Sequence, residues 1–147
     1  MALKAPWPRV VLLYACGLLA AVQLGKFSAL APLLATALAL SLTAVALAIS
    51  LVELGGATLG RVGGGLAARF GLVHTLRAGV VALALAGAGE ALAPGAAALF
   101  GFRLLEAMGY LGVVVSAPLL VVRASAAGGP RTQALAMSLW STFVPVG

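Results

Sequence analysis

The sequence predicts an all-α integral membrane protein, and three observations lead to this fold class. Of its 147 residues, 63% are hydrophobic and only 8% are charged, whereas a water-soluble domain has roughly 25% charged residues. The apolar residues form runs close to the ~20 residues that a helix needs to cross the hydrocarbon core of a bilayer. The cations lie mainly between these runs. We therefore expect the chain to sit in a lipid bilayer, with helices that cross it in alternating directions.

The apolar runs predict four complete membrane-spanning helices and the start of a fifth. Only Gln23 and Lys26 break the first run, and Pro32 interrupts the chain after it. The second run leads into a glycine-rich segment, and the third ends at the turn signal Ala-Pro-Gly of residues 93–95. The polar segment 123–131 follows the fourth run and is expected to be a loop. The expected spans are about 10–30, 35–60, 76–92, 96–122 and 133–147.

The composition argues against several function classes. Nine Lys and Arg against three acids give a net charge of +6, but nucleic-acid binding needs cations clustered on one solvated face, so no nucleic-acid partner is predicted. The single cysteine, Cys16, permits neither an intrachain disulfide nor a paired-cysteine metal site. His74, the single histidine, is expected in a solvated loop. The polar residues are too few and too dispersed for an active site, so the sequence predicts no enzyme, no cofactor and no metal.

The distribution of the cations predicts the orientation in the membrane. If the spans alternate, seven of the nine cations fall on one side, namely Lys4, Arg9, Arg61, Arg69, Arg77, Arg123 and Arg131. The loops around Pro32 and Pro94 on the opposite side hold no lysine or arginine. Because cytoplasmic loops carry the excess of Lys and Arg, we expect the N-terminus and the segment 63–79 in the cytoplasm. As a separate expectation, the protein is a multi-pass protein of a bacterial inner membrane.

Ionisable residues within the expected spans are the first candidates for a functional site. Such groups cost several kcal/mol in hydrocarbon unless they face a partner or a wet cavity. Arg103 and Glu106 lie three residues apart in the fourth span, and Tyr110 follows on the same helix face. Two interpretations stay open at this point. The three side chains line a solute path, or the two charges form an internal ion pair that only anchors packing.

The first three spans carry further polar candidates. Gln23 and Lys26 form a polar stripe on the first span, although the lysine can instead extend its amine to the outer interface. Glu53 lies deep in the second span without an obvious partner there, so it is also a candidate for the solute path. Glu90 is next to the Ala-Pro-Gly turn and is expected at the membrane interface.

Small residues predict close packing between the helices. In the second span, Gly56, Gly60 and Gly64 recur at four-residue steps and share one helix face. We expect this face to pack tightly against another helix.

The segment "GGLAARFGLVHTL", residues 64–76, resembles the cytoplasmic loop signature between helices two and three of major facilitator superfamily transporters. That signature reads Gly-x-Leu-Ala-Asp-Arg-x-Gly-Arg-Arg/Lys-x-x-Leu. Ala68 stands where the family has its aspartate, and Leu72 and Val73 replace the basic pair. In the family, the aspartate ties the loop to neighbouring helices and helps to latch one conformational state, a charged contact that an alanine cannot make. The matching residues are Gly64, Leu66, Ala67, Arg69, Gly71 and Leu76.

Other segments are similar to this family in the expected order. "RLLEAMGYLG", residues 103–112, resembles the helix-four pattern, with Glu106 at the polar position, Ala107 in place of the first glycine and Gly109 at the second. "WSTFVPVG", residues 140–147, is similar to the Pro-x-Gly stretch of the fifth helix in some members. Residues 50–64 show a weaker similarity to the cyanate-transporter-like branch.

The resemblance implies a secondary active transporter of small solutes that works by alternating access, with the solute coupled to protons or to a counter-solute. Family members have twelve helices in two six-helix halves, so we expect this chain to be part of the N-terminal half. It would need the C-terminal part of the same protein as its partner and would not transport alone. Two other hypotheses stay open: a small multi-span protein that oligomerises as an exporter or pore, and an accessory membrane subunit that does not transport.

Overall fold

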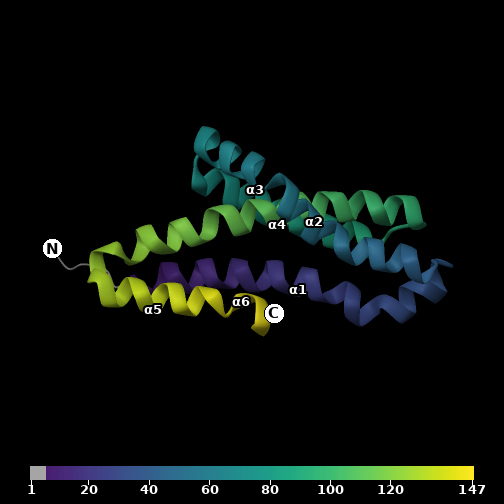
Figure 1. The fold of residues 1–147 in the computed structure, drawn as a ribbon, viewed down its shortest axis with the longest axis horizontal. Helices are drawn as coiled ribbons and strands as arrows, with labels where there is room; N and C mark the ends of the chain where they lie inside the picture. Colours follow the sequence, from purple (N-terminus) through teal and green to yellow (C-terminus); the bar gives the residue numbers. More distant parts are fainter. Residues whose placement is uncertain (1–5) are drawn as a thin grey trace.

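The computed structural model describes residues 6–147, and this part of the chain is built from helices (Figure 1). Its four long helices are apolar and long enough to cross a bilayer, as expected for an all-α membrane protein. They are α1 (Trp7–Ala37), α2 (Leu42–Phe70), α3 (Leu72–Ala91) and α4 (Ala96–Ser125). A short 3₁₀ turn, η1 (Ala126–Gly128), then leads into α5 (Gly129–Ser141) and α6 (Phe143–Val146).

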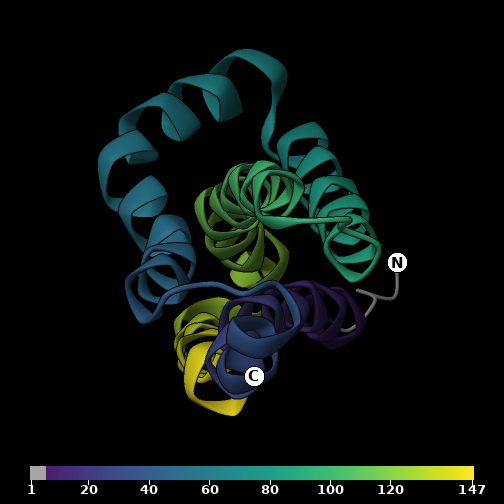
Figure 2. The ribbon, with the colours of Figure 1, turned by 90° about the vertical axis from the view of Figure 1, so that its right-hand side faces the viewer.

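Helix α4 is the centre of the bundle. Consecutive long helices run in opposite directions (Figure 1), and the end-on view in Figure 2 shows α1, α2 and α3 arranged around α4, with α5 beside α1. The contact between α3 and α4 is the most extensive in the bundle. Helix α4 also contributes more buried residues than any other helix. Arg103, Glu106 and Ser116 of α4 are consequently buried by the helices around it.

Helix α1 continues through Pro32, where the sequence led us to expect an interruption. An interior proline removes one backbone hydrogen bond, but a bilayer offers no water to the backbone, so a membrane helix is retained where other groups satisfy it. The helix ends only at Ala37, and α2 starts later than the expected residue 35. In the last turn of α1, the Thr36 hydroxyl donates hydrogen bonds to the carbonyl oxygens of Pro32 and Leu33, at 3.1 and 2.9 Å.

The start of α2 is defined by a hydroxyl cap. Ser41 has an extended backbone, and its hydroxyl accepts a hydrogen bond from the Ala44 amide at 3.2 Å. This satisfies one of the amides that have no partner within the first turn of a helix.

The glycine-rich segment 63–79 contains a one-residue turn instead of a long loop. Helix α2 continues to Phe70 and α3 begins at Leu72. Gly71 alone separates them, with φ of 86°, a backbone conformation that favours glycine. Arg69 lies in the last turn of α2, where a cation is favourable at the negative end of the helix dipole. The other residues of the loop signature, Gly64, Leu66 and Ala67, are helical, and His74 is exposed in the first turn of α3 and not in a loop.

The segment 123–131 is also mostly helical, although we expected a loop. Helix α4 ends at Ser125, the η1 turn follows, and α5 begins at Gly129, whose φ is 81°. The chain then returns along the bundle, so that Gly147 lies against Leu18 and Ala21 of α1.

Close helix packing occurs at other glycines than the sequence indicated. A Cβ atom on Gly56, Gly60 or Gly64 would meet no described atom within 4 Å, so this face of α2 packs against no other described helix. The close approach is between α3 and α4. A Cβ atom on Gly79 would lie 2.8 Å from the carbonyl oxygen of Gly109. These two glycines let the helix backbones touch.

Candidate functional site: a buried charge cluster

Four ionisable side chains from three helices meet inside the bundle. Lys26 comes from α1, Glu90 from the last turn of α3, and Arg103 and Glu106 from α4. The Lys26 amine lies 2.5 Å from Glu90 Oε2 and 2.9 Å from Glu106 Oε1. Arg103 pairs with Glu106, and its Nη1 lies 4.0 Å from Glu90 Oε1. We call these four residues the charge cluster; its two cations and two carboxylates balance.

Exposure within the charge cluster falls from its edge to its centre. The exposed fraction of the side chain is 20% for Lys26, 6% for Glu90, 1% for Glu106 and 0% for Arg103. Removing charges from water is costly, and mutual pairing with good geometry offsets much of that cost. Lys26 is therefore the member that a molecule from outside the bundle would reach first.

Arg103 contacts α1 and α2 in addition to the acids of the charge cluster. Its Nε donates a hydrogen bond to the carbonyl oxygen of Ala48 on α2 at 2.9 Å. Its guanidinium carbon lies 3.9 Å from the centre of the Phe27 ring on α1, a cation–π contact. Its Nη2 is buried and makes no hydrogen bond within the described chain. Since buried polar groups are nearly always hydrogen-bonded, this nitrogen keeps a free capacity to bind an acceptor.

Gln23 positions the lysine. Its amide oxygen accepts a hydrogen bond from the Lys26 amine, and its amide nitrogen donates to the carbonyl oxygen of Leu83 on α3 at 3.3 Å. A Cβ atom on Gly87 would lie 2.7 Å from that amide nitrogen. The glycine on α3 therefore makes the space in which Gln23 turns toward the cluster.

The spacing along each helix explains why the cluster forms. Gln23 and Lys26 are three residues apart on α1, and Arg103 and Glu106 are three apart on α4, so each pair shares a helix face. The two faces meet because α1 packs on α4. Four of the six candidates from the sequence are thus brought together.

The other two candidates lie apart from the charge cluster. Glu53 is exposed on α2 and forms neither an ion pair nor a hydrogen bond with another described residue. Tyr110 is partly buried against the apolar core and does not contact the cluster through a hydrogen bond. The helix face shared by Arg103, Glu106 and Tyr110 is therefore polar only at its first two positions.

Glu90 belongs to the charge cluster, although the sequence indicated only its position next to a turn. It lies in the last turn of α3, and its carboxylate is buried against Lys26. The last turn of α3 folds onto α1 and α4, which carries the side chain into the bundle. The signal in the sequence was the charge balance, since Lys26 and Arg103 both lie within spans and only three acids are present to pair with them.

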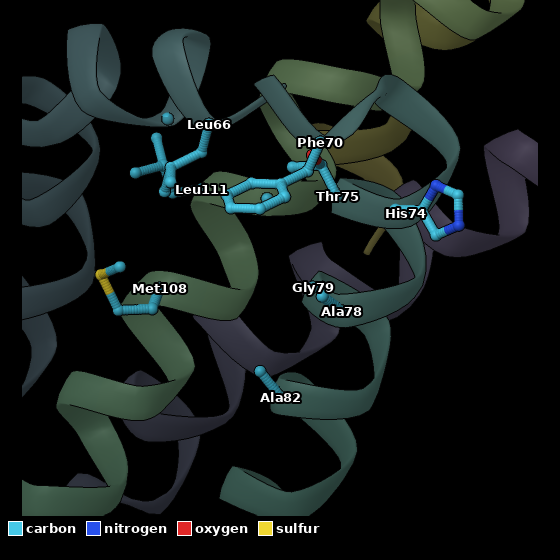
Figure 3. Close-up of a pocket in the computed structure, with 11 residues that line it drawn as sticks. Leu66, Phe70, His74, Thr75, Ala78, Gly79, Ala82, Met108 and Leu111 are labelled. Atoms are coloured by element: carbon cyan, nitrogen blue, oxygen red, sulfur yellow. The ribbon is translucent and has the colours of Figure 1, made fainter. Parts of the chain in front are cut away.

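An apolar pocket of about 620 Å³ lies elsewhere, between the end of α2, the start of α3 and the middle of α4 (Figure 3). Leu66 and Phe70 from α2, His74 from α3, and Met108 and Leu111 from α4 are among its lining residues. None of its lining residues belongs to the charge cluster. Its mainly apolar walls are better suited to lipid or side-chain contact than to an ionic solute.

Comparison with protein-family models, curated proteins and solved structures found no match to this chain. The charge cluster and the helices that hold it are accordingly the basis for a functional assignment.

Proposed function

We propose that this chain is part of a secondary transporter of small solutes, and that the charge cluster lies on the solute path. The observation that carries the proposal is the burial of four charged side chains within membrane-spanning helices. Ionisable groups at such positions are expensive, and they typically mark ion and substrate pathways.

The geometry gives this cluster properties that a transport site needs. Its charges balance, so a cationic solute that binds either carboxylate competes with Lys26 or Arg103 for it. Arg103 Nη2 is buried and free to bind an acceptor. Lys26 is the most exposed member, and it bridges both carboxylates. A solute, a coupled proton or a counter-solute that separates Lys26 from Glu90 would loosen the contact between α1 and α3.

We also propose that the chain has the helix arrangement of the major facilitator superfamily. The residues that resemble the loop signature surround the tight turn at Gly71, between the second and third long helices. Arg103 and Glu106 lie on the fourth helix, where the family has a similar polar pattern. In this proposal the chain supplies helices of the N-terminal half in a bacterial inner membrane. Its N-terminus is cytoplasmic, and the rest of the same protein completes the cavity.

The competing function is that of an accessory membrane subunit in which the charge cluster is only structural. Complete burial of Arg103 favours this alternative, because a group with no exposed surface is not reached without a conformational change. The two functions differ in whether water and solutes reach the cluster during the working cycle.

Thiol accessibility separates the two functions without knowledge of the solute. In cells that express a Cys16→Ser background, Gln23→Cys places a thiol beside Lys26. A charged, membrane-impermeant thiol reagent should modify this position, because a transport site opens to water. Leu85→Cys, on a lipid-exposed face of α3, is the matched control and should stay unmodified. Absence of modification at residue 23 under all conditions would refute the solute path.

A pair of neutralising variants tests the structural role. Arg103→Met leaves Glu106 and Glu90 with one cation, and breaking a buried pair costs about 3–5 kcal/mol. Adding Glu106→Met restores the balance, because Lys26 and Glu90 still pair at 2.5 Å. The double variant should be more stable than the single one. If the stable double variant also loses thiol accessibility at residue 23, the pair serves the solute path; unchanged accessibility would assign it a structural role only.

A further inference from the structure

A second group of charges lies outside the charge cluster. Arg9 on α1, Arg77 on α3 and Arg123 on α4 are all exposed, and they line one groove with a volume of about 720 Å³. The start of α1, the start of α3 and the end of α4 meet at the same end of the bundle (Figure 1). We call this feature the arginine groove.

The floor and walls of the arginine groove are apolar. On α1, Arg9 is followed on the same helix face by Leu12, Leu13 and Cys16, which also line the groove. At a rise of about 1.5 Å per residue, this wall extends roughly 10 Å from the arginine toward the middle of the bundle. Val80 and Val81 of α3 continue the other wall in the same direction. The groove thus combines cations at its mouth with an apolar interior.

No carboxylate is available to the three arginines. The chain has three acids. Glu90 and Glu106 belong to the charge cluster, and Glu53 lies on α2, which contributes no residue to the groove. No ion pair involves any of the three arginines within the described chain. The mouth of the groove therefore carries three unneutralised positive charges from three different helices.

We propose that the arginine groove binds an anionic phospholipid, with the phosphate of the headgroup at the three guanidinium groups and acyl chain along the apolar walls. Charge complementarity supports this occupant, because basic pockets between membrane helices suit anionic headgroups and guanidinium groups form paired hydrogen bonds with phosphate oxygens. A free inorganic phosphate would satisfy the cations but would leave the apolar walls uncovered. A phospholipid matches both parts.

A lipid in this groove bridges the helices that supply the charge cluster. The walls come from α1, α3 and α4, and the same three helices hold Lys26, Glu90 and Arg103 roughly 20–30 Å further along their axes. A bound headgroup holds the three helix ends together by joining their positive charges to one anion. The inference does not depend on the proposed transport activity, because it concerns a separate surface.

Native mass spectrometry of the delipidated chain in a neutral detergent tests the inference. The chain is titrated with dioleoyl phosphatidylglycerol, with dioleoyl phosphatidylcholine, or with inorganic phosphate. We expect one phosphatidylglycerol to bind with a clear preference over phosphatidylcholine. Each basic residue near an anionic headgroup contributes about fivefold to affinity, so the triple variant Arg9→Gln, Arg77→Gln, Arg123→Gln should bind about 100-fold more weakly. Far-ultraviolet circular dichroism confirms that the variant keeps its helices.

A charge-matched variant supplies the control. Arg61→Gln, Arg69→Gln, Arg131→Gln removes the same three positive charges from exposed positions outside the groove, and it should keep the wild-type preference. An equal loss in both triple variants would refute the groove and leave only diffuse attraction. Competition by millimolar inorganic phosphate alone would assign a free-anion site instead. A dimer that carries no lipid and dissociates in the groove variant would assign the surface to a second copy of the chain.

Discussion

The contact between α3 and α4 leads to the sharpest stability prediction. Gly109→Ala adds one methyl group at the closest approach of these helices. Its Cβ atom would lie 2.9 Å from both the Gly79 carbonyl oxygen and the Leu83 amide nitrogen. Both are backbone atoms of α3, so no side-chain rotation relieves the overlap. The two helices must move apart for the methyl group to fit.

The expected loss follows from that displacement. Non-bonded heavy atoms prefer about 3.5–4.0 Å, so the backbones separate by roughly 0.5–1 Å, and a gap of that size forfeits a quarter to a half of each contact energy. Overpacking of this kind costs about 1–3 kcal/mol. The higher helix propensity of alanine returns up to ~1 kcal/mol. With the full propensity gain, we therefore expect Gly109→Ala to lower the free energy of unfolding by up to about 2 kcal/mol.

The control is Gly60→Ala on α2. A Cβ atom there would meet nothing within 4 Å, so only the propensity gain applies, and the free energy of unfolding should stay constant or rise by up to ~1 kcal/mol. Unfolding of both purified variants in a mixed micelle is followed by circular dichroism as the denaturing detergent fraction increases. The reasoning is refuted if the two substitutions change stability by the same amount, or if Gly60→Ala is the more damaging.

Three further predictions concern orientation, the charge cluster and transport. In a background without Cys16, Ala126→Cys should resist an impermeant thiol reagent in intact cells and Gly95→Cys should react; the reverse labelling would contradict a cytoplasmic N-terminus. Glu90→Gln should lower thermal stability in detergent, and the addition of Lys26→Met should recover part of the loss by restoring balance; no recovery would show that the two side chains act independently. Liposomes that contain residues 1–147 alone should show no saturable flux of small anions or amines above empty vesicles, and reproducible flux would favour the small oligomeric transporter.

Much of the membrane architecture could be read from the sequence. The free energy of transferring a side chain into lipid depends on that side chain alone to a first approximation, so a run of apolar residues identifies a span without knowledge of its neighbours. The four long helices follow from this local property. A reversal between the second and third spans was also readable, because glycines permit backbone conformations that other residues avoid, but its position at the single residue Gly71 was not.

The residues at which the helices begin and end were harder to predict from the sequence. The segment 123–131 reverses the chain between α4 and α5 but is more helical than expected. Pro32 is typical of a break in a water-soluble protein, but α1 continues through it. In a bilayer an unpaired backbone group costs several kcal/mol, so the backbone stays helical where a soluble chain would form a loop.

Spacing along one helix predicted which residues of the candidate site form pairs. Only the tertiary structure showed that these pairs meet. The pairs Gln23–Lys26 and Arg103–Glu106 follow from the helical repeat alone. Their meeting, and the entry of Glu90 between them, depends on how α1, α3 and α4 are rotated and shifted against one another. These helices are apolar on all sides, so they lack the amphipathic stripe that shows which face of a soluble helix points inward.

For the same reason, the sequence did not show which glycines lie at a helix contact. The sequence contains both the Gly56–Gly60–Gly64 face and the glycines of α3 and α4, and each pattern permits close packing. Only the tertiary structure shows that α3 and α4 use theirs while the face on α2 touches no described helix. Local hydrophobicity determines that these segments enter the membrane, whereas the rotation of each helix, set by contacts with its neighbours, determines which side chains meet inside it.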